Sequence, residues 1–274
     1  MLSLQRSLWF LKHPKLYPES IRKVNRKIQT LLFPSRVTHT AEARAKAQQE
    51  ATQWCEQYAI DTQSAILQIT GCTEFDSFYQ KFSEQLKTSE TIVEKYAVNM
   101  GGCGNLELIY QLAEYIQAKK VIETGVSYGW SSLAFLLSLK NRQDSMLVST
   151  DLPYAFEGSE NYVGCVVPLE LKSLWKIISY ADREALPQAL KLLPSIDLAH
   201  YDSDKFYEGR LWAYPKLWEA LKPEGIFISD DIHDDFAFRD FCNSIKQQPL
   251  IVKDSTDSGN RYVGVLVKPK TITA

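Results

Sequence analysis

From about residue 105 onward, short runs rich in β-branched residues alternate with segments of helical periodicity. This alternation predicts a mainly parallel sheet covered by crossover helices. Seven runs are candidate strands: Lys120–Glu123, Met146–Thr150, Trp175–Ser179, Ile196–His200, Ile226–Ser229, Leu250–Lys253 and Tyr262–Val267. Only a polar segment, Asp254–Asn260, joins the last two runs, and it is too short for a helix. The last two strands are therefore predicted to form an antiparallel hairpin.

The first hundred residues have a different pattern. Helical segments are expected over residues 1–33, 40–59 and 73–97, and none of them carries an obvious reacting group. The sequence thus predicts an α/β domain over residues 101–274, with a seven-stranded, mostly parallel sheet and a C-terminal antiparallel hairpin. Residues 1–100 are predicted to form a helical cap on that domain.

The charge of the 274-residue chain is unevenly distributed. The net charge is −2, but residues 1–36 hold eight basic side chains and one acidic side chain. This arm is therefore +7 and the remaining 238 residues are −9. The near-zero net charge argues against a protein that binds nucleic acid through bulk positive charge. Two roles stay open for the arm: docking onto the acidic body, which is favoured, or contact with an anionic membrane through Trp9, Phe10 and Leu11.

The five cysteines are scattered, and no two are closer than 17 residues. No CxxC pair is therefore present to form a zinc or thiol-redox site. A scattered, odd number of cysteines is typical of reduced thiols, and the N-terminal segment lacks the pattern of a signal peptide. No uninterrupted apolar run reaches about 18 residues, the length that would predict a membrane-spanning helix. We therefore expect a cytoplasmic protein.

The first strand is followed by a glycine-containing turn. Ligands of open parallel sheets bind outside the carboxyl ends of the strands. In the segment VIETGVSYGWSS, Glu123, Gly125 and Gly129 precede Ser131, which opens a helix. Glycines allow a close approach to a ligand, and a helix N-terminus can bind a carboxylate or phosphate. The fingerprints of dinucleotide and nucleoside-triphosphate sites are missing, which leaves the arrangement used for S-adenosylmethionine (SAM), or a simple packing turn.

Acidic residues follow the next two strands. Asp151 ends the second strand and is placed to accept hydrogen bonds from two ribose hydroxyls, with capping of a helix as the alternative. Asp182 follows the third strand, where two roles are open, alone or together: capping the next helix and approaching an adenine amino group.

The fourth and fifth strands are followed by four carboxylates: Asp202, Asp204, Asp230 and Asp231. Such a group would repel itself unless it is protonated or neutralised, and a hard cation such as Mg²⁺ would neutralise it. The alternative is that some of these acids face solvent or cap helices. Nearby, His200 is expected to be structural, and His233 is placed to line an acceptor site.

Over roughly residues 100–268, these segments in this order resemble the class I SAM-dependent methyltransferases. The resemblance rests on VIETGVSYGWSS, STDL, ADREALP, IDLAHYDSDKFYEGR and LKPEGIFISDDI. The last two segments are similar to the D-G-D-x-x-Y-E and L-K-P-G-G-x-x-x-x-D-D segments of the family that includes macrocin-type sugar O-methyltransferases. The resemblance implies a Rossmann-like fold and SAM as the cofactor.

The resemblance also implies roles for single residues. It implies cofactor binding by six: Glu123, Gly125, Gly129, Ser131, Asp151 and Asp182. In metal-dependent relatives the matching acids bind Mg²⁺, which implies three ligands here: Asp202, Asp230 and Asp231. Asp204 is then the candidate general base, with His233 as a second one. Three residues depart from the pattern: Ser203, Lys205 and Glu224. The cation of Lys205 either lowers the pKa of Asp204 or takes the place of the metal.

The sequence therefore predicts a SAM-dependent methyltransferase that methylates a hydroxyl oxygen of a sugar or other small metabolite, with or without Mg²⁺. One alternative is a SAM-binding protein of the same fold that has lost the reaction. Another is a nucleotide-dependent oxidoreductase, which would need the missing dinucleotide fingerprint. A small-molecule acceptor is the expected partner, and the sequence leaves the formation of a homo-oligomer open.

Overall fold

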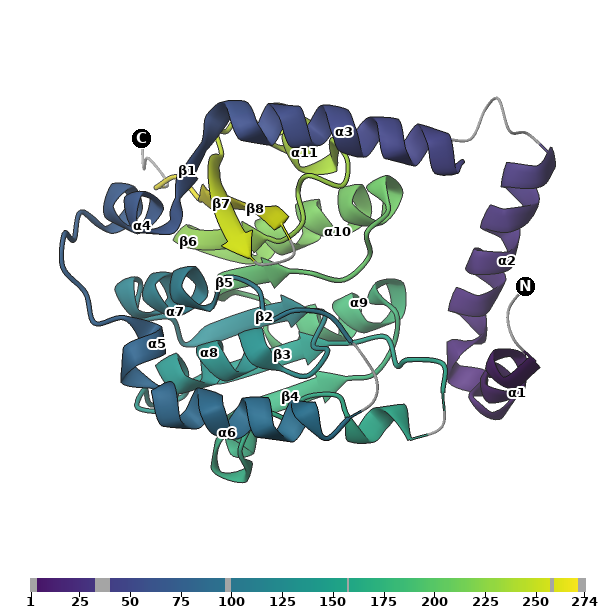
Figure 1. The fold of residues 1–274 in the computed structure, drawn as a ribbon, viewed down its shortest axis with the longest axis horizontal. Helices are drawn as coiled ribbons and strands as arrows, with labels where there is room; N and C mark the ends of the chain where they lie inside the picture. The colour runs from purple at the N-terminus through teal and green to yellow at the C-terminus, as the bar shows by residue number, and fades with distance from the viewer. Residues whose placement is uncertain (1–3, 33–39, 97–99, 157, 257–258, 271–274) are drawn as a thin grey trace.

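A computed structural model describes residues 4–32, 40–96, 100–156, 158–256 and 259–270, and its centre is one eight-stranded sheet (Figure 1). The strand order is β1-β7-β8-β6-β5-β2-β3-β4. All seven predicted strands are present: β2 (Lys120–Thr124), β3 (Met146–Thr150), β4 (Trp175–Ile178), β5 (Ile196–Tyr201), β6 (Leu221–Ser229), β7 (Leu250–Thr256) and β8 (Gly259–Val267). The eighth, β1 (Ala59–Asp61), comes from the N-terminal part and pairs with β7. Three residues are too few to reveal a strand by periodicity.

The sheet has the predicted mixture of strand directions. β2 pairs in parallel with β3 and β5, and the pairs β3–β4, β5–β6 and β1–β7 are also parallel. β8 is antiparallel to both β6 and β7. The central strands are covered on both faces, which explains why their sequences are continuous apolar runs. A mostly parallel sheet with a C-terminal hairpin is confirmed. Within the hairpin, residues 254–256 and 259–260 are strand rather than turn, and residues 257–258 lie outside the described part.

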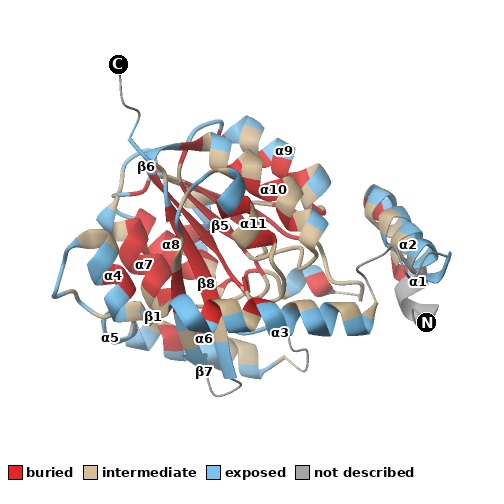
Figure 2. Cartoon of the chain, turned by 90° about the horizontal axis from the view of Figure 1, so that it is seen from above, coloured by how far each residue is buried: buried red, intermediate tan, exposed pale blue. Residues whose placement is uncertain are grey.

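Helices cover both faces of the sheet and form two cores (Figure 2). One core lies under five helices: α4 (Thr62–Thr70), α5 (Phe78–Lys81), α6 (Ser83–Glu94), α7 (Leu106–Tyr115) and α8 (Trp130–Leu139). The other lies under four: α3 (Ala41–Tyr58), α9 (Asp182–Leu192), α10 (Tyr207–Ala220) and α11 (Ala237–Ser244). Short 3-10 turns occupy Ser159–Asn161 and Leu169–Leu174. All five cysteines are free thiols.

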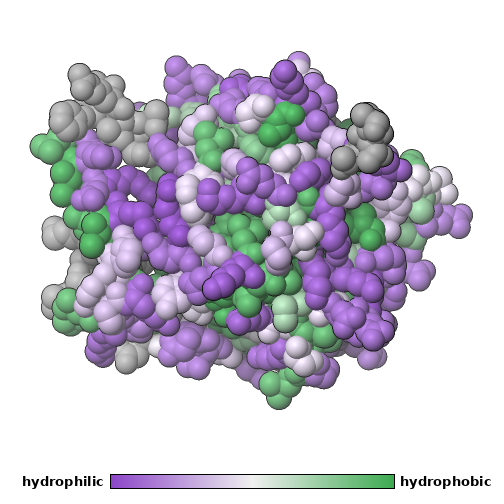
Figure 3. All heavy atoms as spheres, turned by 180° about the vertical axis from the view of Figure 1, so that it is seen from behind, coloured by the Kyte–Doolittle hydropathy of each residue, from purple (hydrophilic) through white to green (hydrophobic). Residues whose placement is uncertain are grey.

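The basic arm forms α1 (Leu4–Lys12), a 3-10 turn (Pro14–Leu16) and α2 (Tyr17–Leu32), which lie beside the main body (Figure 1). Trp9 is buried and its ring stacks on His13, whereas Leu11 is exposed. In Figure 3 apolar residues lie along the outer margin of these helices, and hydrophilic side chains gather toward the body. None of the helices in the described ranges has the length and apolar character that a membrane span needs. β1, from the N-terminal hundred residues, joins the sheet of the α/β domain. The predicted boundary between a helical cap and that domain at residue 100 stays a prediction.

Candidate functional site

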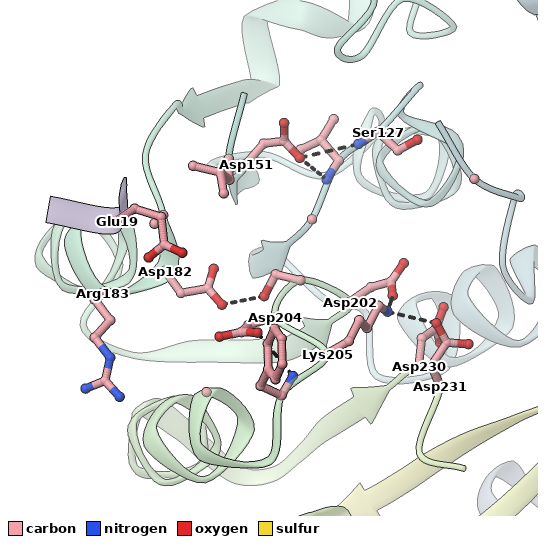
Figure 4. A pocket seen from close by; sticks show the side chains of 18 of the residues that line it. Glu19, Ser127, Asp151, Asp182, Arg183, Asp202, Asp204, Lys205, Asp230 and Asp231 are labelled. Atoms are coloured by element: carbon pink, nitrogen blue, oxygen red, sulfur yellow. Dashed lines mark hydrogen bonds and ion pairs between the residues drawn. The ribbon is translucent and has the colours of Figure 1, made fainter. Parts of the chain in front are cut away.

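A cavity of about 830 Å³ lies at the carboxyl ends of β2, β3, β4, β5 and β6 (Figure 4). Its volume is in the range of small-molecule sites in proteins. It contains seven of the residues that the sequence selected: Gly125, Asp151, Asp182, Asp202, Asp204, Asp230 and Asp231. Four others do not line it: Glu123, Gly129, Ser131 and His233. Their predicted roles are not tested by this placement alone and stay predictions.

The turn after β2 needs glycine at position 125. Gly125 has φ +84°, and a Cβ there would overlap the carbonyl oxygen of Asp202. The Gly125 N–H donates to the carbonyl of Thr150 at 2.8 Å, and the Asp202 N–H donates to the carbonyl of Thr124 at 2.8 Å. These bonds join the ends of β2, β3 and β5. The absence of a side chain at Gly125 thus keeps backbone close to the cavity.

Asp151 has one carboxylate oxygen engaged and one without a partner. Its Oδ1 accepts the N–H of Val126 at 2.9 Å and that of Ser127 at 3.5 Å. Its Oδ2 is buried and accepts no hydrogen bond from the residues that the structure describes. Burial raises the pKa of Asp151 from 3.8 to about 7. Since buried polar atoms are nearly always hydrogen-bonded, this oxygen has room in its hydrogen bonding for a donor from outside the described chain.

Asp182 is the first residue of α9 but does not cap that helix. Its Oδ2 accepts the hydroxyl of Ser203 at 2.5 Å and that of Tyr201 at 3.4 Å. Burial raises the pKa of Asp182 to about 6. The carboxylate therefore faces the end of β5 and the cavity, and the predicted capping role is not what the structure has.

Glu123 is fully buried beneath α8. It accepts hydrogen bonds from three serine hydroxyls: Ser131 at 2.6 Å, Ser132 at 2.5 Å and Ser149 at 2.7 Å. Thus Glu123 and Ser131 are hydrogen-bonded to each other, whereas the sequence predicted that both bind the cofactor. Gly129, with φ +94°, adjoins Gly164: a Cβ at Gly129 would lie 2.8 Å from the Gly164 Cα.

His200 is structural, as the sequence predicted. It is fully buried, with Nδ1 3.7 Å from Glu123 Oε1 and Nε2 3.6 Å from Asp230 Oδ1. Burial alone would lower the pKa of His200, but Asp230 and Glu123 raise it to about 10. The imidazolium therefore lies between two buried acids and neutralises part of their charge.

Replacing Glu123 with alanine is expected to lower the free energy of unfolding by about 3–5 kcal/mol, because the charge of His200 and the serine hydroxyls would lose their buried partner. Urea denaturation followed by circular dichroism measures this change. Glu170→Ala, at an exposed position, is the control and should change stability little. A loss below about 1 kcal/mol for Glu123→Ala would contradict the structural role of this carboxylate.

The acids after β5 and β6 come together around a lysine. Lys205 Nζ donates to Asp231 Oδ2 at 2.8 Å and also to Asp202 Oδ1 (Figure 4). Burial opposes ionisation of Asp231, but Lys205 lowers its pKa below the ordinary value. For Asp202, burial outweighs Lys205 and raises the pKa to about 6. The sequence predicted a cation among these carboxylates, and the chain's own ammonium group lies there.

The arrangement does not fit the expected magnesium site. Within the described ranges, no group of three or more His, Cys, Asp or Glu side chains is placed to hold a metal ion. The ammonium of Lys205 pairs with both Asp202 and Asp231, two of the three expected ligands. The third, Asp230, lies against His200. The donor set is thus neutralised from within the chain.

The two candidate bases lie in different surroundings. Asp204 lines the cavity, and its Oδ1 accepts the N–H of Phe206 at 3.1 Å. Burial raises the pKa of Asp204, so the alternative that Lys205 lowers it is wrong. The ring of His233 packs against that of Tyr262, with centroids 5.6 Å apart, and does not line the cavity.

Sequence reasoning missed one wall of the cavity, which α2 supplies. Six of its residues line the space: Glu19, Arg22, Lys23, Asn25, Arg26 and Gln29. Arg22 donates to both oxygens of Glu184 at 2.7 and 2.6 Å, and the guanidinium of Arg26 lies 4.0 Å from the centre of the Phe206 ring. The basic residues of this segment indicated that the helix has a polar face. They did not indicate that this face lines the cavity.

Comparisons with known proteins agree with the fold. Residues 122–232 match a family model described as a methyltransferase domain. The structure is similar to an O-methyltransferase from Bacillus cereus in complex with SAH: TM-score 0.51, 12% identity, covering 78% of this chain and 100% of that chain. It is also similar to cofactor-bound Rv0187 from MTB: TM-score 0.52, 15% identity, covering 76% and 96%. None of the curated proteins compared with the chain matches it.

Proposed function

We propose that the chain is a SAM-dependent methyltransferase that transfers the methyl group of SAM to a hydroxyl oxygen of a sugar or other small metabolite. The match of residues 122–232 to a methyltransferase-domain model and the fold shared with solved O-methyltransferases support the proposal. The observation that carries this proposal is the unpartnered Asp151 Oδ2, buried beside the close-approach turn at Gly125. A ribose hydroxyl would supply the missing donor.

The residues of the cavity fit SAM. Asp151 would hold the ribose, the backbone of Gly125–Ser127 would adjoin the methionine part, and Asp182 would lie toward the adenine. When bound, SAM supplies an electrophilic methyl group on a positively charged sulfonium. Acidic side chains outnumber basic ones along the cavity, which favours a cationic ligand.

For the acceptor, we propose Asp204 as the group that takes the hydroxyl proton. Its Oδ1 is engaged by the N–H of Phe206, which leaves Oδ2 for the proton. Because burial raises its pKa, the Asp204 carboxylate is a stronger base than an exposed aspartate. His233 does not line the cavity, so we assign it no part in the transfer. No step is assigned to Mg²⁺, because Lys205 neutralises two of its three expected ligands and the third, Asp230, lies against His200.

We propose that the basic arm is part of the site and not a separate module. Its contacts with Glu184 and Phe206 support the favoured expectation of docking onto the acidic body. Because Arg22 and Arg26 face the cavity, α2 would close the acceptor side. Of the aromatic residues expected at a membrane, Trp9 is buried.

The experiment that tests the function is calorimetric titration with SAM, followed by an acceptor screen that measures release of S-adenosylhomocysteine. Binding with release on at least one hydroxyl acceptor is the expected result. Binding without release on any acceptor favours the non-catalytic alternative. No binding of SAM, with binding of NAD(H), would favour the oxidoreductase.

Asp204→Asn is expected to lower kcat by roughly 10²- to 10⁴-fold, because an amide cannot take the acceptor proton. The Kd for SAM should change little, since Asn keeps the oxygen that accepts the Phe206 N–H. Turnover and calorimetry on the same preparation measure both quantities. Glu170→Gln, at an exposed position that does not line the cavity, is the control. Unchanged kcat in Asp204→Asn would exclude Asp204 as the base.

A further inference from the structure

Three acids that a metal would use already have cationic partners from the chain. Lys205 Nζ donates to Asp202 Oδ1 and Asp231 Oδ2, which come from the loops after β5 and β6. Asp230 Oδ1 lies 3.6 Å from Nε2 of the buried His200. In the segment that resembles D-G-D-x-x-Y-E, Lys205 stands directly after the second acid. The lysine is thus an integral part of this corner of the cavity (Figure 4).

We propose that the Lys205 ammonium takes the place of a divalent cation in this cavity: it holds the acids after β5 and β6 together and binds the acceptor oxygen, so that methyl transfer needs no divalent metal. This inference rests on the proposed function for its second half, the acceptor oxygen. Its first half, the occupation of the cation position, can be tested without any reaction.

The chemistry of an ammonium group limits the acceptor. Lysine carries three N–H donors, and two of them serve Asp202 and Asp231. One donor is left among the contacts that the structure describes, and it can bind one acceptor oxygen. A divalent cation instead has several open positions and can chelate two neighbouring oxygens. We therefore infer that the acceptor is bound through a single hydroxyl oxygen and needs no vicinal hydroxyl or carbonyl for binding.

Asp204 is placed to act as the base beside Lys205. An ammonium group donates a hydrogen bond to the acceptor oxygen but does not remove its proton, so a separate base is needed. Asp204 precedes Lys205 in the chain and lines the same cavity, and its Oδ1 is held by the N–H of Phe206. Lys205 would thus bind the acceptor oxygen, and Asp204 would take its proton.

The test is calorimetric titration of the full chain with Mn²⁺, for the wild type and for Lys205→Met, which keeps the apolar stem and removes the charge. The wild type should show no Mn²⁺ binding. Lys205→Met should gain it, because Asp202 and Asp231 would lose the ammonium that neutralises them. Adding Asp202→Asn to Lys205→Met should abolish the gain. Lys191→Met, at an exposed position in α9, is the matched control and should bind no Mn²⁺. Circular dichroism checks that each variant is folded.

Two outcomes would overturn the inference. Mn²⁺ binding by the wild type that Asp202→Asn removes would show that the lysine yields its place to a metal. Absence of binding in both proteins would show that these acids do not form a cation position at all. With an acceptor in hand, EDTA should leave wild-type turnover unchanged and Lys205→Met should lower it roughly tenfold to a hundredfold. A protein that fails to bind SAM contradicts the proposed function, whereas the Mn²⁺ titrations still decide the role of Lys205.

Discussion

Asp151→Ala is expected to weaken SAM binding by roughly a hundredfold or more. The substitution removes the free Oδ2 and also the Oδ1 that holds the amides of Val126 and Ser127. Asp151→Asn keeps an oxygen for those amides but loses the charge, so its affinity should fall about tenfold. Calorimetric titration measures both values.

The control for this pair is Asp144→Asn. Asp144 is exposed and lies shortly before the first residue of β3, whereas Asp151 follows the last residue of that strand. Asp144→Asn should leave the affinity for SAM unchanged. If Asp151→Ala binds SAM as tightly as the wild type, the cofactor does not use this carboxylate, and the assignment of the SAM half of the cavity is wrong.

Asp151 also predicts how SAM binding depends on pH. With a pKa of about 7 in the ligand-free protein, Asp151 is partly protonated near neutral pH. The ionised form is the better acceptor for ribose hydroxyls, so affinity should rise between about pH 6 and about pH 8. Asp151→Asn should remove most of this dependence.

The stability of the ligand-free chain should change in the opposite direction. Between pH 3.8 and about 7, the folded chain holds a proton on Asp151 that the unfolded chain has lost. The free energy of unfolding therefore contains a contribution that falls as pH rises through this interval. Urea denaturation at several pH values, compared between the wild type and Asp151→Asn, isolates it.

Gly125→Ala is expected to destabilise the fold by about 3 kcal/mol or more and to abolish SAM binding. A residue with a side chain is strained at φ +84°, and the added Cβ would overlap the carbonyl oxygen of Asp202. Neither atom can move by a side-chain rotation, because the backbone of residue 125 fixes the Cβ and the oxygen belongs to the Asp202 backbone at the joined ends of β2 and β5. Urea denaturation and SAM titration measure the two effects.

Gly71→Ala separates the backbone strain from the steric overlap at Gly125. Gly71 has φ +72° but a Cβ there would meet no atom within 4 Å, so only the backbone strain of about 1 kcal/mol applies. The difference between the two variants is the cost of the overlap at Gly125. Equal losses in stability would mean that the close approach of the turn to Asp202 does not constrain position 125.

Much of the site was predictable because it follows from the direction of the strands. In a parallel sheet the carboxyl ends lie at one edge, so the acids after four different strands meet in one cavity. The expectation that acids near strand ends reach the cavity fails for Glu123. Glu123 lies within β2 and not after it, and there α8 covers the strand and supplies Ser131 and Ser132 as partners.

The sequence by itself determined the strand and helix pattern, the hairpin and the gathering of acids at one edge, because these depend on local periodicity and strand direction. Only the tertiary structure decided three features: the pairing of β1 with β7, the closing of the cavity by α2, and the position of Lys205 between Asp202 and Asp231. Each joins segments whose contact depends on the path of loops, and no periodic pattern records where a loop places its side chains.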